Sequence, residues 1–254
     1  MTYATLKLTI ENGLARIRFT RPDLLNRFDN PLHNDFTRAL LELLPNQDIR
    51  ALIISGEGKA FSAGGDMEMM LKMKEDQRLR DRMTEEAKLL YETLNNLPVP
   101  TIAAVHGAAV GLGATVALSC DIIVASRDVK LSDPHVVLGL VAGDGGIVSW
   151  SRAIGMTRAK RYLLTGDRIT GAEAYAMGLV TDLVDTPEQV EPAAEALAKK
   201  ILALPHYGIR GTKRAFAALS ANYAGSVVEL GLAYENQNFF GEEVSAAVKA
   251  ALKR

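Results

Sequence analysis

The sequence predicts an α/β fold in which strand–turn–helix units fill the first two-thirds of the chain and helices fill the rest. The first observation is a recurrent order of elements: a short apolar, β-prone run, then a glycine-rich turn, then a helical pattern. The second is the helical periodicity that continues to the end of the chain. We therefore expect a core over residues 1–185 and a helical C-terminal region over 186–254. No linker composition or charge block lies between these two parts.

The clearest unit spans residues 99–121. Residues 101–105 are apolar and β-prone, as in a buried strand. Gly107, Gly111 and Gly113 follow, and a buried helix is expected from there to Leu118. Such a turn leaves backbone N–H groups free at the start of the helix, where they can hold an anion or a developing oxyanion. The alternative is a tightly packed strand-to-helix turn without a ligand.

A second unit of the same form lies upstream. Residues 51–55 are the strand, and a turn over 61–66 opens a helix at Met67. If the two strands are neighbours, the free amides of both turns meet and share one carbonyl oxygen.

The other elements are expected as follows. Two strands form a hairpin through an Asn12–Gly13 turn, and a helix begins with Asn30 as its cap and Pro31 as its first helical residue. A charged, methionine-rich segment over 67–83 is expected to be a mobile helical lid, and a helix over 85–97 ends before Pro98. A third glycine-rich turn over 132–146 leads into a helix carrying Trp150. The remaining predictions are strands over 5–10, 15–19, 122–125, 129–131 and 180–184, and helices over 158–164, 172–175, 187–204, 208–219, 226–240 and 243–252.

Composition narrows the function. The chain has 254 residues and a formal net charge of −1, which argues against nucleic acid or an anionic membrane as the principal partner. The apolar stretch over 102–120 is interrupted by His106 and three glycines, so a buried strand–turn–helix is expected there and not a membrane span. A single cysteine, Cys120, excludes an internal disulfide; with no signal peptide evident, it fits a cytoplasmic protein. The four histidines show no metal-ligand spacing, so no metal is expected.

An ordered set of motifs resembles the crotonase (enoyl-CoA hydratase/isomerase) superfamily over essentially the whole chain. The motifs are Arg21-Pro with Asn26, Phe61-Ser-Ala-Gly-Gly-Asp66, Gly107-Ala-Ala-Val-Gly-Leu-Gly113 with Cys120-Asp121, Thr165-Gly166, and Ala172-x-x-Ala-x-x-x-Gly-Leu-Val180. The resemblance implies a spiral of ββα turns with a helical C-terminal trimerisation region, assembled as a homotrimer or hexamer. It implies a small-molecule substrate with CoA as part of it, no bound cofactor, and an oxyanion hole made by the backbone N–H groups of Gly65 and Leu112. The substrate-binding positions it implies are Ala63, Asp66, Thr115 and Gly143.

The chain departs from the family at its two catalytic glutamates. Thr115 and His135 occupy the aligned positions, so a glutamate pair cannot hold the water. His135 is a candidate replacement base, with Asp144 nine residues further on to fix its tautomer and stabilise the imidazolium. Asp144 also suits the cap of the helix that starts near Gly145.

The His135–Asp144 spacing is similar to that of the 6-oxocamphor hydrolase type, which cleaves β-diketones without CoA. In that group a further His and a Glu line the site, and His33 and Glu235 stand at comparable separations here. Three hypotheses follow: an acyl-CoA enzyme that uses His135 and Asp144, a CoA-independent β-diketone C–C hydrolase, and a non-enzymatic binding protein.

Overall fold

The computed structural model describes residues 2–253, except for the side chains of residues 222–224. Its strands are β1 Leu6–Glu11, β2 Leu14–Phe19, β3 Ala51–Gly56, β4 Thr101–Val105, β5 Ala108–Val110, β6 Ile122–Ser126, β7 Lys130–Ser132, β8 Ile169–Thr170 and β9 Asp182–Val184. Its α-helices are α1 Asn30–Leu43, α2 Met67–Glu75, α3 Gln77–Asn96, α4 Leu112–Ser119, α5 Gly146–Leu163, α6 Gly171–Met177, α7 Val190–Leu202, α8 His206–Asn238 and α9 Glu242–Ala251, with short 3-10 turns at Pro22–Leu24, His135–Leu138 and Pro187–Gln189. The predicted α/β class is therefore confirmed.

The main sheet has the order β1-β2-β3-β4-β6-β9 and is parallel except for the β1–β2 hairpin. Asn12 and Gly13 both have positive φ, as the predicted Asn-Gly turn requires. A second sheet, β5-β7-β8, contains two short strands that the sequence analysis did not predict, β5 and β8.

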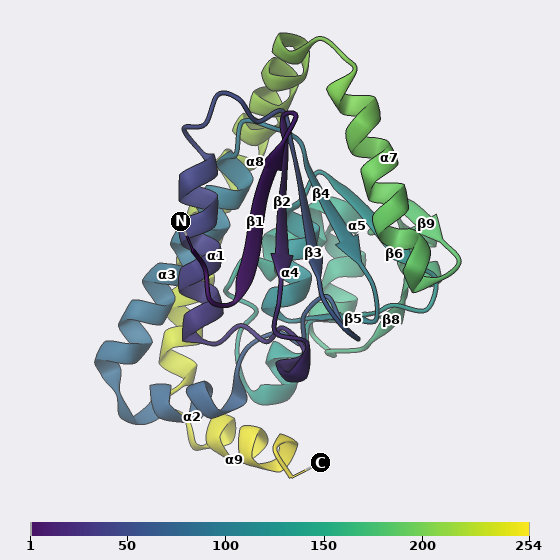
Figure 1. Ribbon diagram of the computed structural model, residues 1–254. Helices are drawn as coiled ribbons and strands as arrows, with labels where there is room; N and C mark the ends of the chain where they lie inside the picture. The colour runs from purple at the N-terminus through teal and green to yellow at the C-terminus, as the bar shows by residue number, and fades with distance from the viewer. Residues whose placement is uncertain (1, 254) are drawn as a thin grey trace.

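Alternating side chains bury both faces of the main sheet. Ile53, Ile102 and Val124 point toward α7, while Ile54 and Val105 belong to the larger core on the opposite face. Figure 1 shows α7 alone on one side of the sheet and α1, α4 and α5 on the other. β3 and β4 are parallel neighbours, so the turns that follow them reach the same edge of the sheet.

Four local predictions differ from the structure. The cap of α1 is Asp29, one residue earlier than expected, and its side chain accepts a hydrogen bond from the N–H of Leu32. The segments 67–83 and 85–97 divide differently, because Asp76 ends α2 and caps α3. The segments 208–219 and 226–240 are one continuous helix, α8, because no proline interrupts it and a single interior glycine such as Gly225 costs only about 1 kcal/mol. The helix predicted over 158–164 continues α5, with a kink at Gly155.

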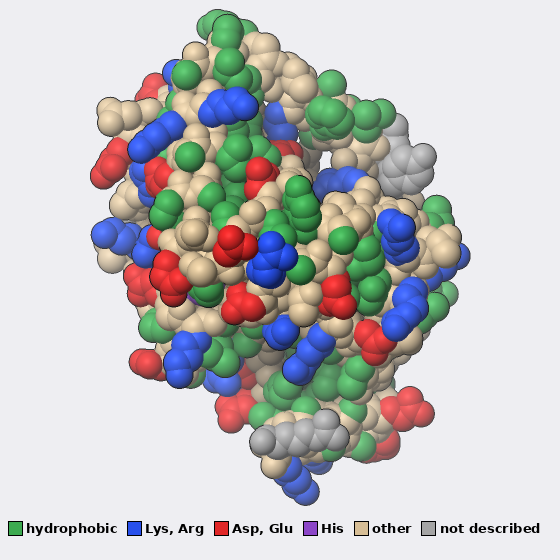
Figure 2. Space-filling view, turned by 90° about the vertical axis from the view of Figure 1, so that its right-hand side faces the viewer, with side chains coloured by type: hydrophobic (Ala, Val, Ile, Leu, Met, Phe, Trp, Pro, Cys, Tyr) green, Lys and Arg blue, Asp and Glu red, His purple; other side chains and the backbone are tan. Residues whose placement is uncertain are grey.

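Charged side chains of both signs are interspersed over the face shown in Figure 2, with apolar side chains between them. Within residues 2–253, no helix combines the length and the apolar character needed to cross a bilayer.

Candidate active site

The two glycine-rich turns meet, as their positions after β3 and β4 predict. Ser62 and Ala109 form an isolated β-bridge, and the N–H of Val110 donates to the carbonyl oxygen of Ser62 at 3.1 Å. Gly64 has a φ of +85°, and a Cβ on it would lie 2.4 Å from the carbonyl oxygen of Val110. Only glycine satisfies both the left-handed backbone and this close approach.

Each turn presents one backbone N–H to the same cavity. Leu112 is the first residue of α4, so its N–H has no partner inside the helix. Among the described residues, the N–H groups of Gly65 and Leu112 donate to no other protein atom. Both residues line one cavity, of about 120 Å³.

That cavity has a polar side and an apolar side. The polar side chains are His33, His135, Asp144 and Glu235, so the structure brings together all four side chains proposed as catalytic. The apolar side chains come from α2, α3, α8 and the turns, and they include five methionines: Met67, Met69, Met70, Met73 and Met83. Ala63 also lines the cavity.

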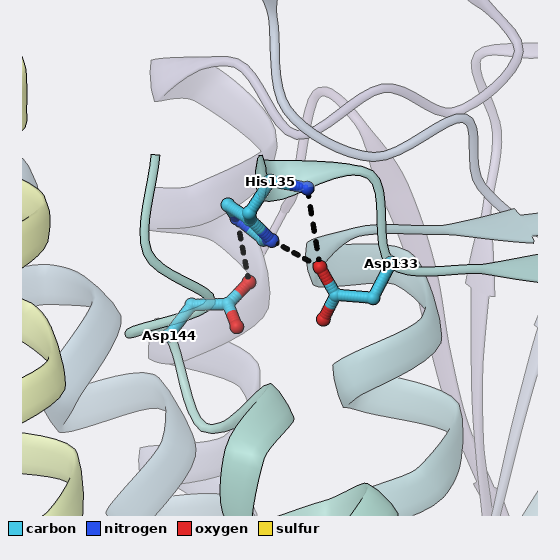
Figure 3. A group of neighbouring side chains, drawn as sticks. All are labelled: Asp133, His135 and Asp144. Atoms are coloured by element: carbon cyan, nitrogen blue, oxygen red, sulfur yellow. Dashed lines mark hydrogen bonds and ion pairs between the residues drawn. The ribbon is translucent and has the colours of Figure 1, made fainter. Parts of the chain in front are cut away.

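His135 lies between two buried aspartates (Figure 3). Its Nδ1 makes a short hydrogen bond to Oδ1 of Asp133, at the end of β7, and its Nε2 faces Oδ2 of Asp144 at 3.7 Å. Asp144 is fixed in turn, because its Oδ1 accepts hydrogen bonds from the Thr115 hydroxyl at 3.0 Å and from the N–H of Gly146 at 3.1 Å. Asp144 thus also accepts from the first residue of α5, although the N-cap of this helix is Gly145 and not Asp144.

The hydrogen bond that holds the ring comes from Asp133, whereas the sequence analysis expected it from Asp144. Asp133 was not selected, although Ser132-Asp-Pro-His135 places an acceptor two residues before the histidine, a spacing that permits a local side-chain contact. With Asp133 on Nδ1, Asp144 is left on the Nε2 side, where the ring exchanges protons. Thr115, expected as a substrate-binding position, is not among the residues that line the cavity; its hydroxyl donates to Asp144 and positions that carboxylate.

Burial and the two aspartates act in opposite directions on the imidazole. Burial lowers the pKa of His135, but the charges of Asp133 and Asp144 outweigh it and raise that pKa well above its ordinary value. Burial raises the pKa of Asp144, and the charge of His135 opposes that rise. The raised pKa keeps the imidazole of His135 protonated at neutral pH, with its Nε2 facing Oδ2 of Asp144.

Glu235 reaches the same cavity from α8. Burial, with the nearby Asp144 and Asp133 adding to it, raises the pKa of Glu235 to about 8, so this carboxyl is protonated at neutral pH. Gly143 has no Cβ because one would lie 2.7 Å from Oε2 of Glu235 and 2.5 Å from the carbonyl oxygen of Gly231. The role of Gly143 is thus to let α8 approach.

Several buried polar atoms in and beside the cavity have no hydrogen-bond partner within the described part of the chain. In the lining they are His33 Nδ1, Asp144 Oδ2 and Glu235 Oε2, and behind it Asp133 Oδ2. Buried polar groups without partners are rare and costly, so their concentration here is typical of a site that binds a polar ligand.

The other predicted positions lie around the cavity. His33, in the first turns of α1, packs edge-to-face on Phe28, and burial lowers its pKa to about 4. It is therefore a neutral imidazole. Asp66 caps α2 through the N–H of Met69 and forms an ion pair with Arg27 at 2.9 Å. Asp66 thus fixes the turn that carries Gly65 and does not line the cavity itself.

The described residues hold one cluster with metal-ligand geometry, Asp133, His135 and Asp144. The Nδ1 of His135 is already hydrogen-bonded to Asp133, and the charges of the cluster are explained by the imidazolium. We therefore assign no metal to it.

Two converging glycine-rich turns beside buried, partly unpaired acid–base side chains are typical of an enzyme active site. Residues 9–249 match the model of a protein family described as "Enoyl-CoA hydratase/isomerase". A probable enoyl-CoA hydratase of Mycobacterium tuberculosis is 34% identical over 239 residues, covering 94% of this chain and 90% of its own. The 1,2-epoxyphenylacetyl-CoA isomerase of Escherichia coli is 29% identical over 240 residues, covering 89% of this chain and 87% of its own.

The fold gives the same result. The crystal structure of an enoyl-CoA hydratase/isomerase from Mycobacterium paratuberculosis superposes with a TM-score of 0.93 at 33% identity, covering 98% of this chain and all of the other. The chain belongs to the enoyl-CoA hydratase/isomerase family of the crotonase superfamily.

Proposed function

We propose that this enzyme adds water reversibly to an enoyl-CoA ester, with the His135–Asp144 pair moving the protons that two glutamates move in other members of the family. The observation that carries the proposal is the position of this pair. Both side chains are buried and line the cavity that also holds the free N–H groups of Gly65 and Leu112. The relatives named as enoyl-CoA hydratases support the substrate class.

The thioester oxygen binds to the N–H groups of Gly65 and Leu112. When water adds to the β-carbon, the electron pair of the double bond moves through the α-carbon to this oxygen and forms an enolate. Two preorganised donors stabilise that charge, and each is worth roughly 10²- to 10³-fold in rate. A backbone donor needs no particular side chain, so leucine at position 112 serves as well as glycine.

The resting ion pair supplies both an acid and a base. Oδ2 of Asp144 is unpartnered and accepts a proton from the attacking water, while the Nε2–H of His135 delivers a proton to the α-carbon. The product is a 3-hydroxyacyl-CoA. A proton then passes from Asp144 to Nε2 across the 3.7 Å gap and restores the ion pair. In this scheme His135 is the acid, because its raised pKa leaves it protonated, and Asp144 is the base; the sequence analysis had expected His135 to be the base.

Glu235 is proposed as a neutral donor. Its protonated carboxyl keeps the net charge of the buried cluster at −1 instead of −2 and offers an O–H to the substrate. His33, also neutral, contributes a second uncharged polar group to the cavity wall.

The protein is further proposed to assemble as a homotrimer or hexamer in the cytoplasm. The support is the outward face of α8, on which Tyr207, Phe216 and Leu219 are more than half exposed.

Turnover and thermal stability of the purified protein test the proposal, with crotonyl-CoA, free CoA and a bicyclic β-diketone measured side by side. Hydration and stabilisation by crotonyl-CoA are expected, with a loss of about 10²- to 10⁴-fold in Asp144→Asn, the range for one acid–base group. Asp128→Asn is the matched control, because Asp128 is an exposed aspartate remote from the cavity lining. Ring opening of the diketone with no response to CoA esters would replace the proposal by the C–C hydrolase alternative. No response to any of the three would favour either a different acyl-CoA substrate or a non-enzymatic binding role.

A further inference from the structure

Arg80 is a buried cation without an anionic partner. It lies in the first turn of α3 and is 1% exposed, yet within the described part of the chain no carboxylate forms an ion pair with it. Burying a charge is costly unless polar groups replace its hydration. The contacts of the Arg80 guanidinium therefore indicate its structural role.

Those contacts join three elements. Nη1 donates to the carbonyl oxygens of Met73 at 2.5 Å and Lys74 at 3.4 Å, in the last turn of α2. Nε donates to Oδ1 of Asn236 on α8 at 3.3 Å, and the guanidinium lies 4.0 Å from the ring centroid of Phe240. The end of a helix leaves carbonyls unpaired and carries partial negative charge, so α2 itself provides the counter-charge.

The elements joined by Arg80 carry the apolar wall of the cavity. Met73 is a lining residue and a direct partner of Arg80, and Phe239 is the lining residue next to Phe240. Glu235, also a lining residue, directly precedes Asn236, whose Oδ1 accepts the hydrogen bond from Nε of Arg80. α2 has only nine residues and packs chiefly on α3 and α9, so its position depends on few ties. A second polar contact near this end of α2, from Lys74 to Glu242 of α9, involves a glutamate whose side chain is 89% exposed, so this ion pair is worth little. The other end of α2 is held separately by its cap, Asp66.

We propose that Arg80 is a positioning residue that fixes the methionine-lined wall of α2 against α8 and so sets which acyl groups the cavity accepts. The wall is entirely apolar and the polar side of the cavity carries carboxylates, so the preferred acyl group is uncharged and compact. The volume supports compactness: a cavity of about 150 Å³ holds one benzene ring, and this one measures about 120 Å³. This inference rests on the proposed acyl-CoA function for its selectivity readout, but not for its structural one.

Three variants test the inference. Arg80→Met removes the charge and all donors. Arg80→Lys keeps the charge but loses the planar fork that reaches α2 and α8 together. Lys88→Met is the matched control, because Lys88 also ties α3 to α8, through Glu229 at 2.5 Å, and has no bond to α2.

The first readout is hydrogen exchange of the α2 amides in the free protein. We expect exchange to be about tenfold faster or more in Arg80→Met, intermediate in Arg80→Lys and unchanged in Lys88→Met, because opening of a segment held by few contacts responds directly to the loss of one. Equal exchange in Arg80→Met and Lys88→Met would overturn the inference. If Arg80→Met does not fold, the comparison of Arg80→Lys with Lys88→Met decides in the same way.

The second readout is kcat and KM for crotonyl-CoA and for an eight-carbon enoyl-CoA. For Arg80→Met we expect KM for crotonyl-CoA to rise about tenfold, kcat to stay within about threefold, and the preference between the two esters to shrink, since uniform binding is lost while the chemistry stays intact. Faster α2 exchange with unchanged KM and unchanged preference would refute the role in selectivity. Absence of turnover in the unmodified protein would refute the proposed function and leave the exchange result to decide on Arg80.

Discussion

Replacing Asp133 by asparagine tests the charge distribution of the site most directly. The substitution keeps the size of the side chain and an oxygen acceptor for Nδ1 of His135, but it removes the negative charge in contact with the ring. Because that charge raises the pKa of His135, its loss lowers the pKa. An opposite charge at such a distance shifts a pKa by about 1 to 3 units, which corresponds to about 1.4 to 4 kcal/mol. Both side chains are buried, so solvent screening does not reduce this range.

The consequence appears on the alkaline side of the pH profile. If protonated His135 gives its proton to the α-carbon, activity falls as pH rises through its pKa, and in Asp133→Asn this fall begins about 1 to 3 pH units lower. The assay is kcat/KM for crotonyl-CoA against pH, together with an NMR titration of the His135 ring, which does not depend on turnover. Asp128→Asn serves as the control. An unshifted ring titration would refute the electrostatic reasoning. A shifted titration with an unshifted profile would refute the role of His135 as the acid.

Three further predictions concern the partners of this pair. Thr115→Val removes the hydrogen bond that lowers the pKa of Asp144, so this pKa rises and the acidic limb of kcat/KM moves to higher pH; an unmoved limb would exclude Asp144 as the base. Gly64→Ala strains a left-handed residue and pushes the two turns apart, at a cost of about 1 to 3 kcal/mol in the free energy of unfolding, whereas Gly208→Ala, in open space on a helix, leaves the midpoint of thermal unfolding equal or higher. Glu235→Gln imitates the protonated carboxyl, so activity at pH 7 stays within about tenfold, and the variant lacks only the part of the alkaline loss that comes from ionisation of Glu235 near pH 8; a complete loss at pH 7 would show that its proton is transferred.

The glycine-rich turns could be predicted because their geometry restricts the residue type at single positions. At Gly64 the backbone has a positive φ, and a Cβ would clash with a carbonyl oxygen. Only glycine is compatible with both conditions, so such positions can be recognised in the sequence. Parallel pairing of β3 and β4 then makes two such turns meet, so Gly65 and Leu112, the positions that the family resemblance implies for the oxyanion hole, line one cavity. The N–H groups themselves need no side chain.

The side-chain partners were harder to predict. Asp133 stands two residues from His135, yet the choice between Asp133 and Asp144 for Nδ1 depends on the 3-10 turn that begins at His135 and on the start of α5. The role of Arg80 depends on the break at Asp76, where the sequence analysis expected one helical segment over 67–83. The acceptor for Nδ1 of His135 and the contacts of Arg80 both depend on packing between elements far apart in the chain. Hydrophobic periodicity cannot predict such packing.

The proposed mechanism gives a physical reason why the family's glutamate pair can be absent while its chemistry is kept. Two glutamates need one proton between them to be acid and base at once, and their pKa values must be separated by their environments. An imidazolium beside a carboxylate reaches the same state with opposite charges, because each group stabilises the charged form of the other. Asp133 then favours the protonated imidazole, and Glu235 adds no further negative charge because it remains protonated. The oxyanion turns are unaffected by this exchange, because their donors belong to the backbone. Under the proposed mechanism, the change of side chains therefore alters the pH range of the reaction more than its course.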